Sequence, residues 1–191
     1  MLADSFSEAS CGEAASSQEA IQLAMGEPWD LIILELSLGC YGGLDLLKQI
    51  RRMQPQIPVL VFTAYGEQQY ALRAIRAGAV GYVTKVSCAA EVVRAVKKVA
   101  QGGRFISATL AETLSAHLQK KSPESVHDQL SDRECQVMRL IGTGKTICQI
   151  ALLLSISDKT VSTYRARILE KTGMKTTAQL IRYMVELGFI D

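Results

Sequence analysis

The first half of the chain alternates between two kinds of apolar pattern. Short continuous apolar runs, typical of buried strands, are followed by stretches in which apolar residues recur every three or four positions, as in amphipathic helices. The predicted strands cover Leu31–Leu34, Val59–Phe62 and Gly81–Thr84, and the predicted helices cover 43–53, 70–75 and 89–100. This alternation predicts an α/β fold with a parallel sheet and helices on both of its faces.

The pattern changes after a polar stretch. Residues 116–129 contain Pro123 and show no apolar period, which predicts a linker between a domain of residues 1–115 and one of residues 130–191. The second domain shows four helical patterns in a row, each preceded by residues that can cap a helix start. These caps are Ser131 with Glu134, Thr146 with Gln149, Ser157, and Thr176 with Gln179. Gly173 and Gly188 are placed to end the last two helices.

The second and third of these helices are joined by a short turn, which is the layout of a helix-turn-helix. On a helical wheel, the third helix directs Val161, Tyr164 and Ile168 inward, and Ser162, Thr163 and Ala166 outward. The outward face is flanked by the cations Lys159, Arg165, Arg167 and Lys171. Cations can contact phosphates and short side chains can reach base edges, so the face suits a DNA groove. A solvated helix in an ordinary bundle explains this pattern equally well.

Charge and composition narrow the class of protein only modestly. The net charge is +2. Residues 1–115 carry 10 Lys and Arg against 11 Asp and Glu, a net of −1, and residues 116–191 carry 11 against 8, a net of +3. The apolar runs are far shorter than a membrane span, and the N-terminus lacks the pattern of a secretory signal, so we expect a cytoplasmic protein with no membrane partner. The five cysteines show no C-x-x-C spacing, which indicates reduced thiols.

The second domain resembles the DNA-binding domain of LuxR-type, specifically NarL/FixJ-type, response regulators. The resemblance covers LSDRECQVMRLIGTGKTICQIALLLSISDKTVSTYRARILEKTG and is specific. It implies double-stranded DNA as the partner and a homodimer in which the helix 177–187 pairs. It places Ser162, Thr163 and Ala166 at the base-reading positions and makes Lys159, Thr160 and Arg167 candidates for phosphate contact, with Arg165 and Lys171 beside them. Family members often carry larger polar residues at the base-reading positions, so this chain is expected to rely more on methyl contacts and DNA shape.

The first domain resembles the second half of a receiver domain, a flavodoxin-like fold with strand order 2-1-3-4-5. The resemblance lies in DLIILELSLG, PVLVFTAY and AGAVGYVTK, and Ser10–Ala24 resembles the second strand and helix of that fold. Receivers carry a phosphate-accepting aspartate after the third strand and an acidic pair after the first. By this resemblance the phosphoacceptor position is Glu35, and the switch positions are Thr63, Tyr82 and Lys85.

The start of the receiver pattern is missing. About ten residues precede the segment that resembles the second strand, which is too few for a first strand and its helix. We therefore predict a flavodoxin-like parallel sheet lacking its first strand and helix, followed by a small all-α domain of four helices. Leu31–Leu34 is left with an unpaired edge. We expect either Met1–Ala15 to fold back against this edge, or another chain to cover it in a dimer.

The missing acidic pair changes the expected chemistry. Phosphoryl transfer to a carboxylate requires a divalent cation, which the acidic pair would hold. Because the sequence lacks this pair, it predicts no metal site, no cofactor and no catalytic residue. Glu35 either forms a permanent ion pair with Lys85 or is a solvated residue at the end of a strand, and both interpretations stay open. We interpret the chain as a DNA-binding transcription regulator that works without phosphorylation. The alternatives are a receiver phosphorylated by a histidine kinase, through Asp45 or another carboxylate, and a module that binds another regulatory protein.

Overall fold

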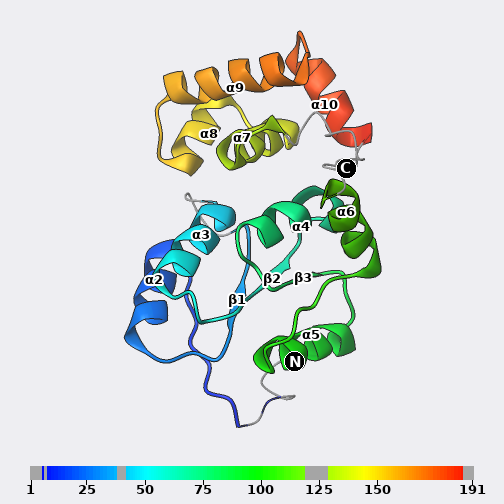
Figure 1. The fold of residues 1–191 in the computed structure, drawn as a ribbon. Coiled ribbons are helices and arrows are strands. Elements are labelled where there is room, and N and C mark those ends of the chain that lie inside the picture. Colours follow the sequence, from blue (N-terminus) through cyan, green and yellow to red (C-terminus); the bar gives the residue numbers. More distant parts are fainter. Residues whose placement is uncertain (1–5, 7, 38–41, 119–128, 187–191) are drawn as a thin grey trace. The chain divides into compact units, whose positions relative to one another are not determined.

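The computed structural model describes residues 6, 8–37, 42–118 and 129–186. The chain divides into two compact units, residues 1–119 and 120–191 (Figure 1). Each unit has its own hydrophobic core.

A three-stranded parallel sheet forms the centre of the N-terminal unit. Its strands are β1 (Ile32–Leu34), β2 (Val59–Thr63) and β3 (Gly81–Thr84), in the order β1-β2-β3. Strands buried on both faces are continuous runs of apolar residues, which is how the sequence encodes these three. The sheet therefore confirms the predicted parallel fold without a first strand, because β1 is paired only with β2 among the described residues.

Helices cover both faces of this sheet (Figure 1). They are α2 (Ser17–Gly26), α3 (Gly43–Met53), α4 (Glu67–Arg76), α5 (Ala89–Ala100) and α6 (Ala108–Leu118). Successive residues of β2 point to opposite faces: Val59 and Val61 join the core beneath α3 and α4, and Leu60 joins the core against α5. The parallel strands thus bury apolar side chains on both sides.

Two local expectations differ from the structure. Helix α6 was not predicted, and it extends to Leu118, three residues into the segment predicted as linker. Residues 119–128 of that segment lie outside the described residues. Ser10–Ala14, at the start of the segment that resembles the second strand and helix of a receiver, forms no strand, although the helix α2 that follows is present. A strand needs a hydrogen-bonded neighbour, and the neighbour that this segment would have in a receiver is the missing first strand.

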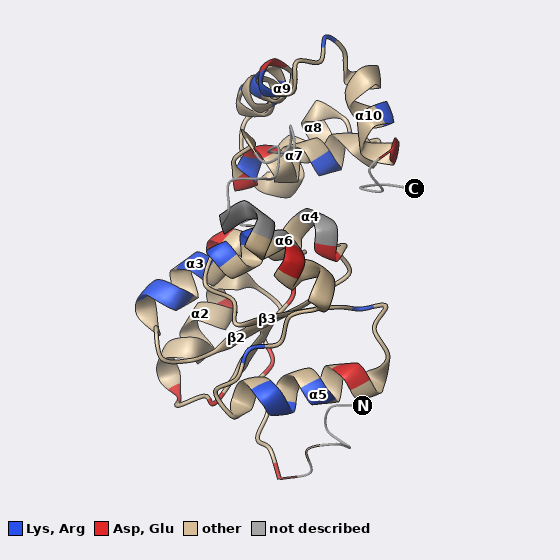
Figure 2. Cartoon of the chain, turned by 45° about the vertical axis from the view of Figure 1, so that its right-hand side comes forward, with Lys and Arg blue, Asp and Glu red and all other residues tan. Residues whose placement is uncertain are grey.

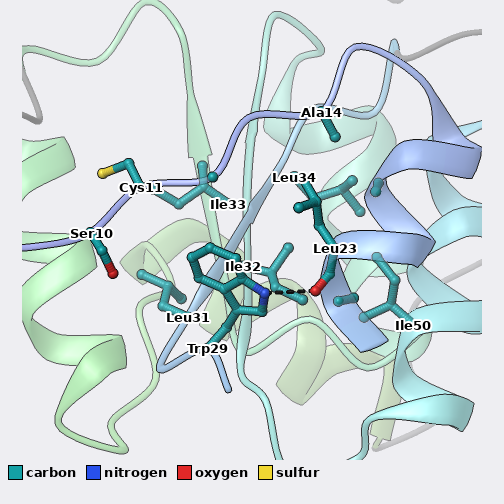
Figure 3. A pocket seen from close by; sticks show the side chains of 13 residues that line it. Ser10, Cys11, Ala14, Leu23, Trp29, Leu31, Ile32, Ile33, Leu34 and Ile50 are labelled. Carbon is teal, nitrogen blue, oxygen red and sulfur yellow. Dashed lines mark hydrogen bonds between the residues drawn. The ribbon is translucent and has the colours of Figure 1, made fainter. Parts of the chain in front are cut away.

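The described part of the N-terminal segment faces β1 across a pocket. Ser10–Ala14 lines one side of this pocket of about 230 Å³ and β1 lines the other, with α2 and Trp29 between them (Figure 3). The Trp29 indole donates a 2.8 Å hydrogen bond to the Leu23 carbonyl and closes part of the space. The segment thus folds back towards the edge as expected but forms no ladder with it. The alternative of a second chain on this edge stays a prediction.

Four helices form the C-terminal unit: α7 (Asp132–Gly142), α8 (Ile147–Leu154), α9 (Asp158–Thr172) and α10 (Thr177–Glu186). Their buried sides share one core that contains Val137, Ile150, Val161, Ile168 and Leu180. The predicted capping boxes at the starts of α7 and α8 are both present. Gly173 ends α9 in the left-handed conformation, as predicted. The predicted end of the fourth helix at Gly188 lies outside the described residues.

None of the helices that the structure describes combines the length and the apolar character needed to cross a membrane.

Candidate functional sites

Helix α9 presents a face of small side chains to solvent. Its N-cap Ser157 accepts a hydrogen bond from the Thr160 amide, and Val161 and Ile168 are buried in the core. These contacts fix the rotation of the helix, so that Ser162, Thr163 and Ala166 are exposed, as the wheel predicts. The Thr163 hydroxyl donates to the Lys159 carbonyl at 2.9 Å, so the backbone of α9 already binds this hydroxyl.

The predicted phosphate-contact residues belong to the same helix, on which Figure 2 shows basic residues in blue. The side chains of Lys159, Arg165 and Arg167 are exposed, and none of them forms an ion pair within the part of the chain that the structure describes. Thr160 is partly buried, and its hydroxyl lies 2.8 Å from that of Ser157. The arrangement leaves three cations available to an anionic ligand.

Lys171 differs from the other cations because its ammonium is already paired. Its Nζ lies 2.7 Å from Oε2 of Glu134, whose side chain is 3% exposed. The same carboxylate accepts a 2.8 Å hydrogen bond from the Ser131 amide. Burial opposes the charged form, but the contacts with Lys171 and Ser131 outweigh it and lower the pKa of Glu134. Sequence reasoning identified Glu134 only as a helix cap, since a partner 37 residues away leaves no local signal.

A cluster of polar side chains lies at the carboxyl end of the sheet in the N-terminal unit. Glu35 follows β1, Thr63 ends β2, and Lys85 follows β3, so three neighbouring parallel strands bring them together. The Thr63 hydroxyl donates to Oε1 of Glu35, and the Lys85 ammonium lies 2.8 Å from Oε2. The ion pair between Glu35 and Lys85, one of two interpretations open from the sequence, is thus present.

Glu35 is held in its charged form. Burial favours the neutral acid, but Lys85, the Thr63 hydroxyl and the Ser37 amide together outweigh it and lower the pKa of the carboxyl group. The Ser37 amide donates to Oε1 at 3.0 Å. Oε2 accepts no aligned hydrogen bond, so its contact with Lys85 is chiefly one of charge.

The residues around Glu35 do not fit the Mg²⁺ ion that receiver domains use. Mg²⁺ needs a nearly octahedral set of oxygen ligands. Here hydrogen-bond donors occupy Oε1 and an ammonium group occupies the side of Oε2. Among the described residues there is no group of three or more His, Cys, Asp and Glu that is suited to a metal ion.

Tyr82, the predicted switch aromatic, points into the unit. It is 2% exposed, and its hydroxyl donates to the Tyr65 carbonyl at 2.8 Å. Thr63 lies two residues before Tyr65 and is fully buried, and its hydroxyl accepts a 3.3 Å hydrogen bond from the Tyr65 amide. The loop after β2 therefore links the predicted switch positions Thr63 and Tyr82 through Tyr65.

Comparison with known proteins identifies both units. Residues 2–97 match the family described as "Response regulator receiver domain", and residues 128–184 match "Bacterial regulatory proteins, luxR family". The response regulator GacA of Pseudomonas aeruginosa is 33% identical over 192 residues, which cover 100% of this chain and 90% of GacA. The response regulator UvrY of Escherichia coli K12 is 29% identical over 181 residues, which cover 94% of this chain and 83% of UvrY.

Solved structures show the same fold. The RcsB response regulator of Salmonella typhimurium superposes with a TM-score of 0.68 at 23% identity, covering 97% of this chain and 90% of RcsB. A LuxR-family two-component response regulator from Aurantimonas sp. is 34% identical with a TM-score of 0.52, covering 57% of this chain and 78% of that one. The chain belongs to the NarL/FixJ-type response regulators, in which a receiver domain precedes a LuxR-type helix-turn-helix domain.

Proposed function

We propose that this response regulator binds double-stranded DNA through α9 and controls transcription without being phosphorylated on its receiver unit. The observation that carries the proposal is that Glu35, at the position that resembles the acceptor aspartate, accepts a hydrogen bond from Thr63 and is neutralised by the ammonium of Lys85. The proposed place of action is the cytoplasm.

The DNA-binding part rests on the exposed face of α9. Small side chains there permit close approach to a groove, and we propose that Lys159, Thr160, Arg165 and Arg167 contact phosphates beside it. RcsB, which shares the fold, has been solved as a complex with DNA. Replacement of Arg167 by Ala is expected to weaken binding to all sequences and to lower the salt dependence, whereas Thr163→Ala is expected to change the sequence preference.

We propose a homodimer on DNA, with α10 as the pairing helix. RcsB has been solved as dimers bound to DNA. In this chain Val185 of α10 is 50% exposed although it is apolar, which suits a helix that packs against a second copy.

Treatment with acetyl phosphate and Mg²⁺ tests the regulatory part. We expect the intact mass, the oligomeric state and the DNA affinity to stay unchanged, because Lys85 neutralises Glu35 and the described residues offer no group of His, Cys, Asp and Glu suited to a metal ion. Glu35→Asp is the matched control: it restores the usual acceptor side chain but not the acidic pair, so it should also gain no mass.

The two rival functions give different results in these assays. A gain of one phosphoryl group by the wild-type chain would support a phosphorylated receiver and a histidine kinase partner, and peptide mapping would show whether exposed Asp45 carries it. A chain that binds no genomic fragment at low salt would instead favour a module that contacts another regulatory protein.

A further inference from the structure

The first turn of α7 contacts the ends of both helices of the helix-turn-helix. Arg133 donates from Nη2 to the Leu154 carbonyl at 3.0 Å, at the last residue of α8. The next residue, Glu134, pairs with Lys171 in the last turn of α9. Two consecutive residues of one helix therefore hold two different helix ends.

Both contacts suit the electrostatics of helix ends. The carbonyl groups of the last turn carry partial negative charge and lack partners within the helix, so the Arg133 guanidinium satisfies one of them on α8. Lys171 is a cation in the last turn of α9, and its pairing with a carboxylate joins that turn to α7. Glu134 itself is 2% exposed, and a carboxylate so buried is tolerated only when it is paired and hydrogen-bonded.

We propose that Glu134 is a positioning residue for the DNA-reading face of α9 and that Lys171 acts through Glu134 rather than on a DNA phosphate. This inference rests on the proposed binding of DNA by α9. It reassigns Lys171, which the sequence placed beside the phosphate-contact residues, because its ammonium already forms a 2.7 Å ion pair with the buried Glu134 carboxylate.

The geometry of α9 explains why its far end matters. At a rise of about 1.5 Å per residue, Ser162 lies about 13 Å along the axis from Lys171. A tilt of about 10° at Lys171 would then displace the base-reading residues by about 2 Å. Hydrogen bonds to base edges need donor–acceptor distances of roughly 2.7–3.2 Å, so such a tilt would break them while leaving longer-range attraction to phosphates intact.

The test compares two properties of full-length variants: the affinity ratio between a DNA fragment selected by the wild-type chain and an unrelated fragment, and the slope of log affinity against log salt. The variants are Lys171→Met, the conservative Lys171→Arg, Glu134→Gln, and the double variant Glu134→Gln/Lys171→Met. Arg167→Ala serves as the phosphate-contact reference, and Lys175→Met controls for loss of an exposed lysine. Circular dichroism melts set a temperature at which every variant is folded.

We expect Lys171→Met to lower the affinity ratio about tenfold, the scale of one lost base contact, with an unchanged salt slope. Lys171→Arg and Lys175→Met should behave as wild type, and the double variant should lose no more than either single variant. A helix cap that only stabilises the fold would leave the affinity ratio unchanged in folded protein.

Three results would overturn the inference while leaving DNA binding intact. The first is a fall of the salt slope by about one for Lys171→Met with both fragments weakened equally, as expected for Arg167→Ala. The second is wild-type behaviour of Lys171→Met, and the third is additive loss in the double variant. A wild-type chain that binds neither fragment would instead refute the proposed function itself, and the inference with it.

Discussion

The two units of the chain each contain a glutamate paired with a lysine, and the pairs lie in different kinds of place. Glu35 follows a strand at the carboxyl end of the sheet, and its side chain is 17% exposed, with Lys85 at 49%. Glu134 lies in the first turn of a helix, and its side chain is 3% exposed, with Lys171 at 38%. One pair lies at the position predicted to correspond to the phosphate-accepting aspartate, and the other joins two helices of the C-terminal unit.

The two pairs differ in the secondary-structure elements that carry their charged residues. Parallel strands bring side chains from consecutive strand ends to one edge, so Glu35, Thr63 and Lys85 meet where a ligand would bind. Helices deliver side chains along their flanks, so Glu134 and Lys171 meet inside the packing between α7 and α9. The same kind of ion pair therefore lies at a sheet edge in one unit and between two helices in the other.

The largest expected effect tests whether the units are independent. Ile150 of α8 is fully buried in the core of the C-terminal unit, so Ile150→Ala should lower the free energy of unfolding of that unit by about 2–5 kcal/mol and abolish DNA binding. Trp29 is the single tryptophan of the chain and lies in the N-terminal unit, so its fluorescence melt should stay unchanged. If the melting temperature of the Trp29 fluorescence transition fell together with that of the C-terminal unit, the two units would be energetically coupled.

The reciprocal change targets the N-terminal unit. A Cβ atom added at Gly43, the first residue of α3, would lie 2.3 Å from the Leu36 Cα, and neither backbone can move away freely. We expect Gly43→Ala to destabilise this unit by about 1–3 kcal/mol, through overpacking next to the Glu35 cluster. The Trp29 fluorescence transition should shift to lower temperature. Gly26→Ala, where the added atom meets nothing within 4 Å, is the control and should not shift it.

Elements with local signals could be predicted from the sequence. The strand runs and the caps at Ser131 and Thr146 follow from neighbouring residues, and the structure shows them where expected. Helix α6 was missed because its apolar residues form only a weak stripe, and its stability comes from packing Leu110 against the core beneath α4. That contact is invisible to a local pattern.

The sequence predicted which residues form the candidate sites, but it did not predict all the contacts between them. The exposed face of α9 follows from helical periodicity alone, and the meeting of Glu35 with Lys85 was one of two open interpretations. The pairing of Glu134 with Lys171 was not foreseen, because the angle between α7 and α9 is a tertiary property. The burial of Glu134, which calls for a cationic partner, is visible only in the structure.

The pH dependence of stability tests the two glutamates, each in its own unit. Both have a lowered pKa in the folded protein, so each stabilises its unit above the unfolded value of about 4.3 and loses this contribution as the pH falls through the folded pKa. Glu35→Gln and Glu134→Gln should each make the stability of its own unit less dependent on pH below about 4.5. Each substitution should act on one unit alone, because Glu35 and Glu134 lie in separate units.

Denaturant unfolding at neutral and acid pH measures how the free energy of unfolding of each unit depends on pH. Trp29 fluorescence follows the N-terminal unit, and circular dichroism of the isolated segment 129–191 follows the C-terminal unit. The matched controls are Glu13→Gln and Glu170→Gln, which replace exposed glutamates in the two units. An unchanged pH dependence in either variant would contradict the lowered pKa of its glutamate.

The smallest expected effect comes from a third pair that is exposed on both sides. Arg182 Nε lies 2.8 Å from Glu186 Oε1, one turn along α10, with side chains 82% and 58% exposed. The arginine precedes the glutamate, the less favourable order for the helix dipole, and water screens both charges, so Arg182→Ala should change the free energy of unfolding by less than about 0.5 kcal/mol. Chemical unfolding at two protein concentrations extends the test to the proposed dimer. A larger loss that appears only at the higher concentration would show that Arg182 contacts a second copy, because only an interface between chains becomes more stabilising as the chains are concentrated.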